Sequence, residues 1–162
     1  FFTTGSHCMN AKDSDILKLL NDGHELANHG MYDFPYNKHS KEQFEKDLIE
    51  TDLILKKYTT NIPPFYRAPH ARYSKNMDYI IKKRGMIHVV CDAFASDTST
   101  PDPVWISKYI TKKTKPGSIL LIHMPEKGVR EWNLEAMELT LKWLKDNNFK
   151  VVTLTELFKN TI

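Results

Sequence analysis

Several polar side chains capable of acid–base or metal chemistry directly follow apolar segments that favour β-strands. In parallel α/β folds, binding and catalytic groups gather where the strands end, at their carboxyl side. We therefore expect a functional site at that edge of the predicted sheet. The residues in question are His29, Arg67, His70, Asp92, Asp97 and His123.

His29 and Asp33 are four residues apart, in Asn28-His29-Gly30-Met31-Tyr32-Asp33. If the chain makes a helical turn here, this spacing brings both side chains to one face. An imidazole nitrogen and a carboxylate oxygen both bind zinc, at about 2.0–2.2 Å. The alternative is structural, with His29 packed in a turn and Asp33 capping the loop before Pro35.

His123 ends the most apolar strand candidate of the chain, residues 118–123. A histidine held at the end of such a strand is placed to act as an acid. A neighbouring carboxylate would set its tautomer and its affinity for a proton, and Asp92 and Asp97 are both available. The alternative is a hydrogen-bonded histidine with a structural role only.

Arg67 and His70 follow another strand candidate, in Arg67-Ala68-Pro69-His70. The guanidinium of Arg67 could bind a carboxylate through two hydrogen bonds. Pro69 would hold the backbone N–H of His70 in a fixed direction, as an oxyanion hole requires. The alternative is a surface arginine followed by a turn proline.

The elements that must position these residues alternate between strands and helices. The apolar pattern predicts strands over residues 1–4, 65–67, 86–91, 118–123 and 149–153, with a possible strand end at 25–29. It predicts a loop from the first strand through residue 9, and helices over 13–22, 40–58, 74–84, 103–115 and 131–147, with a short one from residue 155. Asp13 or Ser14 could cap the first of these helices, and Ser40 with Gln43 could form a capping box at the second. Six β-α units favour a mainly parallel sheet, as a nearly complete (β/α) barrel or an open doubly wound sheet. We expect residues 1–162 to form one domain.

Composition excludes several classes of protein. The 162 residues are 41% hydrophobic and 27% charged, which is typical of a globular domain. The net charge of +3, from 23 basic and 20 acidic residues, is too small and too scattered to indicate a nucleic-acid partner. Two cysteines support neither a disulfide framework nor a zinc knuckle. No apolar run approaches the roughly 20 residues of a transmembrane helix.

Five segments occur in the order of the motifs of one enzyme family. Phe1-Phe2-Thr3-Thr4-Gly5 resembles A-T-F-F-x-x-G, and Gly23-His24-Glu25-Leu26-Ala27-Asn28-His29 resembles G-H-E-I-x-N-H, which opens H-[S/T]-x-x-H. Tyr66-Arg67-Ala68-Pro69-His70 is similar to R-x-P-Y, Asp97 lies at the position of the D-W pair, and Leu121-Ile122-His123 matches L-x-H. The sequence thus resembles the polysaccharide deacetylases of carbohydrate esterase family four, which include chitin and peptidoglycan N-acetylglucosamine deacetylases. The resemblance implies a distorted (β/α) barrel.

The resemblance also implies a reaction, the metal-dependent hydrolysis of N-acetyl groups from an amino-sugar polymer with release of acetate. His29 and Asp33 would hold a divalent metal, with zinc expected, and the backbone at His70 would donate to the oxyanion. Arg67 would orient the catalytic base. In the second half of the chain, His123 would be the acid that protonates the leaving amine. Asp97 would tune the acidity of His123.

The chain departs from the family pattern at several of these positions. Asp33 stands where the family has a second histidine, His70 where it has tyrosine, and Thr98 where it has tryptophan. Met124 follows His123, where aspartate is frequent. The T-F-D-D-G motif, which supplies the base and a third metal ligand in the family, is absent. We expect either a piece of a complete enzyme or a protein without that strand, and weak metal binding.

Two alternatives follow from these departures. The first is an inactive carbohydrate-binding protein whose aromatic residues stack on sugar rings, with Tyr32 and Phe94 as the expected substrate contacts and Phe34 and Tyr36 beside them. The second is a hydrolase that acts on another amide. The expected partner is a carbohydrate polymer or oligomer, and the resemblance alone suggests secretion or association with the cell wall.

Overall fold

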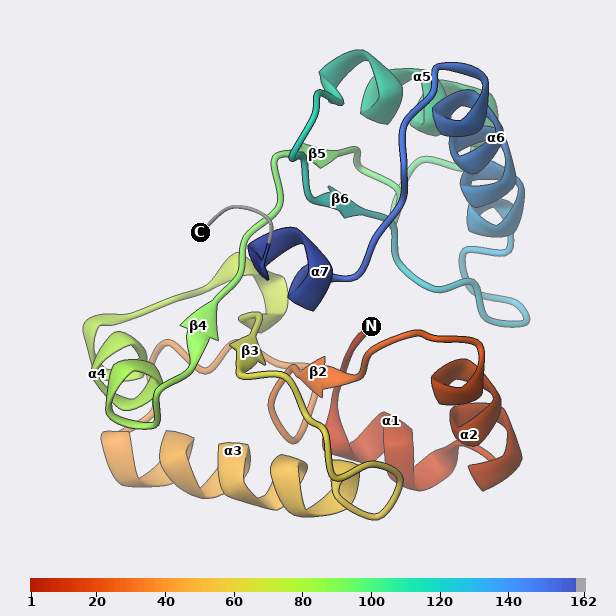
Figure 1. Cartoon of the computed structure of the whole chain (residues 1–162). Coiled ribbons are helices and arrows are strands. Elements are labelled where there is room, and N and C mark those ends of the chain that lie inside the picture. Colours follow the sequence, from red (N-terminus) through yellow and green to blue (C-terminus); the bar gives the residue numbers. More distant parts are fainter. Residues whose placement is uncertain (160–162) are drawn as a thin grey trace. The chain divides into compact units, whose positions relative to one another are not determined.

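The computed structural model describes residues 1–159. Its helices and short strands alternate along the chain (Figure 1). The structure divides into two compact units, and each is described by itself. The N-terminal unit comprises Phe1–Val90 with Thr153–Thr155, and the C-terminal unit comprises Cys91–Val152 with the residues from Glu156. That the whole chain forms one domain stays a prediction.

The N-terminal unit is built on a parallel sheet of four two-residue strands in the order β1-β2-β3-β4. The strands are β1 (Phe2–Thr3), β2 (Ala27–Asn28), β3 (Phe65–Tyr66) and β4 (Ile87–His88). The connections contain α1 (Gly5–Asn10), α2 (Asp13–Asn21), α3 (Lys41–Leu55), the 3-10 turn η1 (Pro69–Ala71) and α4 (Lys75–Lys83). Every neighbouring pair is parallel, as the alternating pattern predicts.

Helix α3 runs along one face of this sheet with α4 beside it (Figure 1). Phe44 and Leu48 of α3 and Ile80 of α4 are buried against Tyr66 of β3 in one apolar cluster. Ser40 caps α3 in the predicted way, since its hydroxyl accepts from the N–H of Gln43 and the Gln43 side chain accepts from the N–H of Ser40. Packing and capping together fix the helix that supports β2 and β3.

The C-terminal unit contains a parallel pair of strands, β5 (Ala93–Phe94) and β6 (Leu120–Leu121). Helices α5 (Pro103–Lys113) and α6 (Trp132–Asp146) lie side by side, and α5 packs on β5 (Figure 1). Asp102 caps α5, because its carboxylate accepts the N–H of Trp105 at 2.9 Å. The last described helix is α7 (Leu154–Lys159).

Three local predictions were wrong. Residues 5–9 are not a loop, because the Thr4 hydroxyl accepts the N–H of His7 at 3.2 Å and begins α1. Neither Asp13 nor Ser14 caps α2, since the helix follows Lys12 without a side-chain cap. Residues 149–153 form no strand within the described part of the chain, where Val151 is 64% exposed. In addition, the apolar pattern did not predict β5.

No helix in the described residues is both long enough and apolar enough to cross a bilayer.

Candidate active site

The candidate residues form two groups, one in each unit. His29, Tyr32, Asp33, Arg67 and His70 belong to the N-terminal unit. Phe94, Asp97 and His123 belong to the C-terminal unit and follow or end its two strands.

His29 and Arg67 directly follow the neighbouring strands β2 and β3, and the N–H of Arg67 donates to the carbonyl of Asn28 at 3.2 Å. His29 Nδ1 lies 2.6 Å from the carbonyl oxygen of Arg67. A carbonyl can only accept, so Nδ1 carries a proton, and in the neutral ring Nε2 is the nitrogen with the lone pair. A backbone carbonyl on the second nitrogen is the usual support of a metal-binding histidine.

Asp33 and His70 lie together at the surface of the N-terminal unit. Asp33 Oδ1 is 3.3 Å from His70 Nε2, and the two side chains are 58% and 50% exposed. His70 has φ 53° and ψ 18°, and Ala71 after it also has φ 53°, a left-handed conformation that is uncommon outside glycine. The backbone after Pro69 is therefore sharply turned, while its role as an oxyanion donor stays a prediction.

Tyr36 organises the loop between His29 and Asp33. Its hydroxyl accepts the N–H of Tyr32 at 2.8 Å and donates to the carbonyl of Tyr32 at 3.2 Å. Its ring packs on Gly30, where an added Cβ would lie 2.6 Å from the nearest ring atom. Gly30 stands at the serine or threonine position of the family motif, and the Tyr36 ring fills the space that such a side chain needs. Sequence patterns did not reveal this role of Tyr36.

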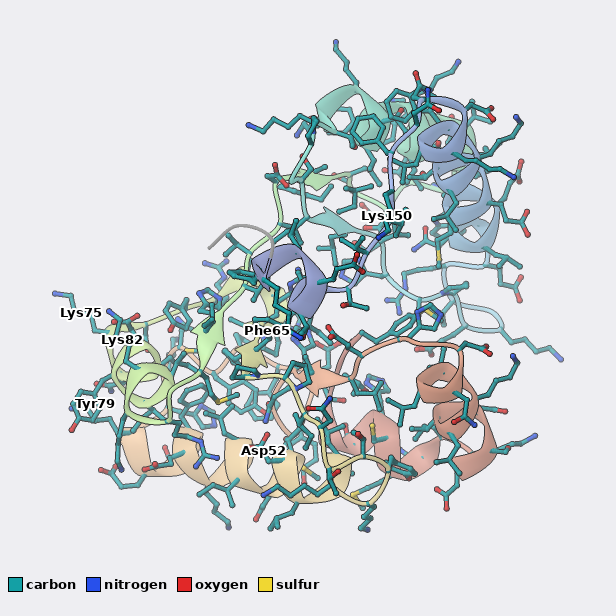
Figure 2. The ribbon with its side chains drawn as sticks, in the orientation of Figure 1. Asp52, Phe65, Lys75, Tyr79, Lys82 and Lys150 are labelled. Atoms are coloured by element: carbon teal, nitrogen blue, oxygen red, sulfur yellow. The ribbon has the colours of Figure 1, made fainter. Side chains whose placement is uncertain are left out.

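Asn28, just before His29, is buried and forms several hydrogen bonds that have a structural role. Its Nδ2 donates to the carbonyl of Leu48 at 3.0 Å and to Asp52 Oδ1 at 2.8 Å, and its Oδ1 accepts the N–H of Gly30 at 2.8 Å. Asp52, which lies on α3 (Figure 2), also accepts from Arg84 at 2.9 Å. Asn28 thus ties the end of β2 to α3 and to the loop that carries Asp33.

The Arg67 side chain contacts a backbone carbonyl and an aromatic ring of its own unit. Its Nε lies 3.3 Å from the carbonyl of Val89, and its Cζ lies 4.2 Å from the centre of the Phe2 ring. A guanidinium over an aromatic face is favourable and holds the side chain in place. Its predicted role, orienting a catalytic base, stays a prediction.

The chemistry of these donors can be compared with the needs of a metal. A catalytic zinc site takes three protein ligands. His29 is prepared to be one and the Asp33 carboxylate could be another, but no cluster of three histidine, cysteine or acidic side chains that could hold a metal occurs among residues 1–159. The described residues therefore supply part of a ligand set and do not complete one.

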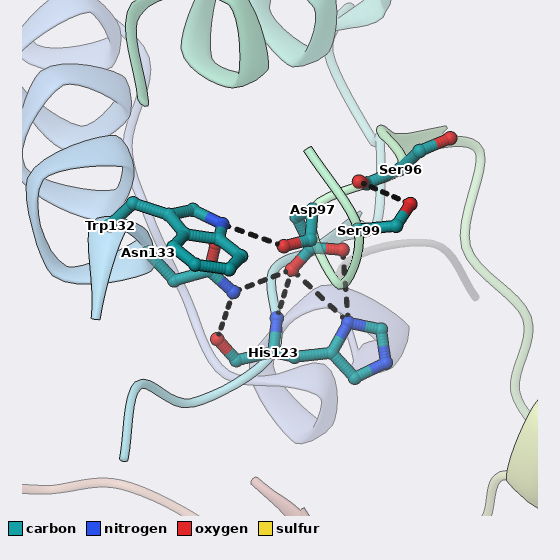
Figure 3. Close-up of polar contacts among 6 residues, drawn as sticks. All are labelled: Ser96, Asp97, Ser99, His123, Trp132 and Asn133. Carbon is teal, nitrogen blue, oxygen red and sulfur yellow. Dashed lines mark hydrogen bonds and ion pairs between the residues drawn. The ribbon is translucent and has the colours of Figure 1, made fainter. Parts of the chain in front are cut away.

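In the C-terminal unit, Asp97 and His123 are in direct contact (Figure 3). His123 Nδ1 lies 3.0 Å from Asp97 Oδ1, and the N–H of His123 donates to Asp97 Oδ2 at 2.7 Å. Burial alone would raise the pKa of the Asp97 carboxyl, but the hydrogen bonds from the His123 side chain and backbone outweigh it, and the pKa is lowered. The ionised carboxylate therefore holds the Nδ1–H tautomer of His123.

The structure also shows which of the two candidate carboxylates, Asp92 or Asp97, contacts His123. Asp92 Oδ1 accepts the N–H of Ile119 at 2.7 Å, and Asp92 Oδ2 accepts the hydroxyl of Ser118 at 3.0 Å. Asp92 therefore holds the start of the segment that leads to β6, and Asp97 is the partner of the imidazole.

Two residues of α6 complete the surroundings of Asp97, and sequence reasoning missed both. Trp132 Nε1 donates to the backbone carbonyl of Asp97 at 2.9 Å. Asn133 Nδ2 donates to Asp97 Oδ2 and to the carbonyl of His123, each at 2.9 Å (Figure 3). The only available signal was an amide in the first turn of an otherwise amphipathic helix.

The two predicted substrate contacts are both exposed aromatic side chains. Tyr32 is 49% exposed and stacks on Phe34, with ring centres 5.9 Å apart and planes inclined by 18°. Phe94 is 45% exposed, and the Lys113 ammonium lies 5.1 Å from the centre of its ring. Contact of either residue with a sugar stays a prediction.

Comparison with known proteins agrees with this arrangement. The family model described as "Polysaccharide deacetylase" matches residues 1–89, more than half of the chain. The chain therefore belongs to the polysaccharide deacetylase family, as its motifs predict.

A peptidoglycan-N-acetylglucosamine deacetylase of Bacillus cereus is 24% identical over 99% of the chain, which spans 58% of the length of that relative. A family 4 acetyl xylan esterase from Clostridium thermocellum, solved with a cobalt ion, is 25% identical with a TM-score of 0.86 over 98% of this chain and 76% of its own. A peptidoglycan N-acetylglucosamine deacetylase structure is 21% identical with a TM-score of 0.90 over 98% and 74%. These similarities confirm the predicted fold class, an α/β fold of the polysaccharide deacetylase (β/α) barrel type.

Proposed function

We propose that this chain belongs to a polysaccharide deacetylase that hydrolyses N-acetyl groups of an amino-sugar polymer, such as chitin or peptidoglycan, and releases acetate. The observation that carries the proposal is the contact between Asp97 and His123. The Asp97 side chain is 2% exposed and ionised, whereas the His123 side chain is 44% exposed. A buried carboxylate behind an accessible imidazole is the arrangement of a general acid–base catalyst.

The chemistry of His123 follows from this contact. With Nδ1–H directed at Asp97, Nε2 is the nitrogen through which a proton can be exchanged with substrate. When both nitrogens are protonated, the Asp97 carboxylate stabilises the imidazolium, and Nε2 can give its proton to the leaving amine. Breaking the amide bond requires such a donor, because an unprotonated amine is a poor leaving group.

The proposal includes a divalent metal, with zinc expected and with His29 and Asp33 as two of its ligands. When bound, a metal of this kind polarises the acetyl carbonyl and lowers the pKa of its water. His29 supports the proposal because its Nδ1 proton is given to the carbonyl of Arg67, the usual support of a metal-binding histidine. In the family a third ligand comes from the T-F-D-D-G motif, which is not part of this sequence.

Other residues have assisting roles in the proposal. The backbone N–H of His70 donates to the oxyanion that forms on the acetyl carbonyl, and Arg67 orients the base. Tyr32 and Phe94 offer exposed ring faces on which a pyranose could stack. The sharply turned backbone at His70, φ 53°, supports a fixed N–H direction there.

The test joins metal content to acetate release. The protein, with any natural upstream segment included, is loaded with zinc and given chitin oligomers, beside Asp33→Ala, His123→Ala and the exposed control Asp146→Ala. We expect about one zinc per chain and acetate release in the unchanged protein and the control. Asp33→Ala should lose both, and His123→Ala should lose acetate alone. No acetate from the zinc-loaded unchanged protein would contradict the proposal.

A second candidate is a carbohydrate-binding protein without catalysis. It is favoured by the contact between Asp33 and His70, which engages the predicted ligand carboxylate with a side chain that the family does not have. It is also favoured by the exposed stack of Tyr32 on Phe34. Binding of chitin oligomers with neither zinc nor acetate release, and loss of that binding in Tyr32→Ala, would support this candidate over the enzyme.

A further inference from the structure

The first turn of α6 contacts Asp97 through two successive residues (Figure 3). Trp132 holds the backbone carbonyl of Asp97, and Asn133 holds its carboxylate. The same Asn133 amide nitrogen also donates to the carbonyl of His123. The Asn133 side chain is therefore hydrogen-bonded to both members of the pair, to the side chain of Asp97 and to the backbone of His123.

The direction of the Asn133 amide is fixed by its surroundings. Both neighbours of Nδ2 are acceptors, a carboxylate oxygen and a carbonyl oxygen, and Nδ2 has two hydrogens to give. The reversed amide would place Oδ1 against two oxygens and lose both bonds. Asn133 is fully buried, so no solvent competes for these hydrogens.

Packing alone does not explain why a side-chain amide occupies position 133. Its Oδ1 is buried and has no hydrogen-bond partner among the described residues. A buried polar atom without a partner costs about 1–3 kcal/mol. An apolar side chain of the same shape, such as leucine, would avoid that cost at this position. What leucine could not do is donate to Asp97 and to His123 together.

We propose that Asn133 is a positioning residue for the Asp97–His123 pair. It joins the Asp97 carboxylate to the His123 backbone, and so keeps Oδ1 of the carboxylate in line with Nδ1 of the imidazole. Without it, the carboxylate can turn about its last bond and the end of β6 can move away. The inference rests on the proposed function, in which His123 protonates the leaving amine, but the geometry can be tested without activity.

The test compares Asn133→Leu with Thr140→Val in the full chain. Thr140 is a matched control, since it is buried on the same helix and its hydroxyl donates only to the carbonyl of Ala136, at 2.7 Å. Nitrogen-15 NMR reports the tautomer of the His123 ring, and acetate assays report kcat and KM separately. In Asn133→Leu we expect a mixture of tautomers and a kcat lower by about 10- to 100-fold with little change in KM. Thr140→Val should leave both unchanged.

A single Nδ1–H tautomer in folded Asn133→Leu would overturn the proposal, whether or not the protein is active. If the unchanged protein releases no acetate, the proposed function fails. The tautomer of His123 in Asn133→Leu still tests whether Asn133 positions the pair. Should the leucine variant not fold, the unchanged chain provides the measurement. Both Nδ2 hydrogens of Asn133 should then exchange slowly with solvent, and fast exchange would overturn the proposal.

Discussion

His70 Nε2 lies 3.3 Å from Asp33 Oδ1, and these two residues stand at positions where the chain departs from the family pattern. The family has tyrosine at the position of His70 and histidine at the position of Asp33. The two departures therefore form one structural change, in which the Asp33 carboxylate and the His70 imidazole contact each other. The carboxylate proposed as a zinc ligand already has a partner, which is a physical reason for the weak metal binding that we predict.

Replacing His70 should show how strongly this partner competes with zinc. The pair is more than half exposed on average, and exposed pairs are worth about 0–1 kcal/mol. His70→Tyr should therefore raise the affinity for zinc modestly, at most about fivefold. Competition with a fluorescent zinc chelator measures the change.

The control for this variant is His24→Tyr, since His24 is an exposed histidine of the same unit that is not one of the proposed metal ligands. It should leave the zinc affinity unchanged. A fall in affinity on changing His70 would contradict the competition and identify its imidazole as a ligand.

Gly30→Ala should lower the free energy of unfolding more than Gly23→Ala, although both glycines have nearly the same φ. Gly30 and Gly23 have φ of +82° and +86°, so alanine is strained at both by about 1–2 kcal/mol. Only Gly30 faces the buried Tyr36 ring, at 2.6 Å, which adds an overpacking cost of about 1–3 kcal/mol. Urea unfolding followed by circular dichroism measures both variants, and equal costs would contradict the packing of Tyr36 on Gly30.

Tyr36→Phe tests the hydroxyl separately from the ring. Burial raises the pKa of Tyr36 to about 12, so the hydroxyl keeps its proton at ordinary pH and donates to the carbonyl of Tyr32. Its removal leaves the N–H of Tyr32 without its acceptor and should cost about 0.5–1.5 kcal/mol. Tyr79→Phe, on the exposed side of α4 (Figure 2), should cost nothing measurable in the same urea titration.

The strand ends explain how much of the site could be predicted. The sequence placed His29 and Arg67 after separate strands, and β2 and β3 proved to be neighbours, so their contact follows from topology. Asp97 and His123 also meet beyond a parallel pair of strands, β5 and β6, but β5 was not predicted, and only the family resemblance singled out Asp97 as the partner of His123. A parallel sheet makes such contacts predictable because it aligns the carboxyl ends of neighbouring strands.

The supporting residues could not be predicted, because their roles depend on packing between segments distant in sequence. Asn133 lies in a helical pattern that gives an amide no special position, yet its partners are 36 and 10 residues away. Asn28 lies inside a recognised motif, but nothing in its spacing indicates that it binds Asp52 on α3. Strands of two residues also carry too little alternation for periodicity to fix their ends.

Asp97→Asn should weaken the C-terminal unit and change its response to acid. The amide that replaces one carboxylate oxygen would be a donor, facing the donors of His123 or Asn133, which costs about 1–3 kcal/mol. The three tryptophans, Trp105, Trp132 and Trp143, all lie in this unit, so their fluorescence during urea unfolding reports its stability.

The sign of the pH dependence follows from the lowered pKa of Asp97. A carboxyl whose pKa is lower in the folded state contributes its full stabilisation above the unfolded pKa, about 3.9. It loses that contribution as the pH falls through the lower folded pKa. The unchanged protein should therefore lose stability more steeply below about pH 4 than Asp97→Asn, while Asp146→Asn, with an exposed carboxylate, should follow the unchanged protein. Parallel curves for the unchanged protein and Asp97→Asn would mean that Asp97 is not held ionised by His123.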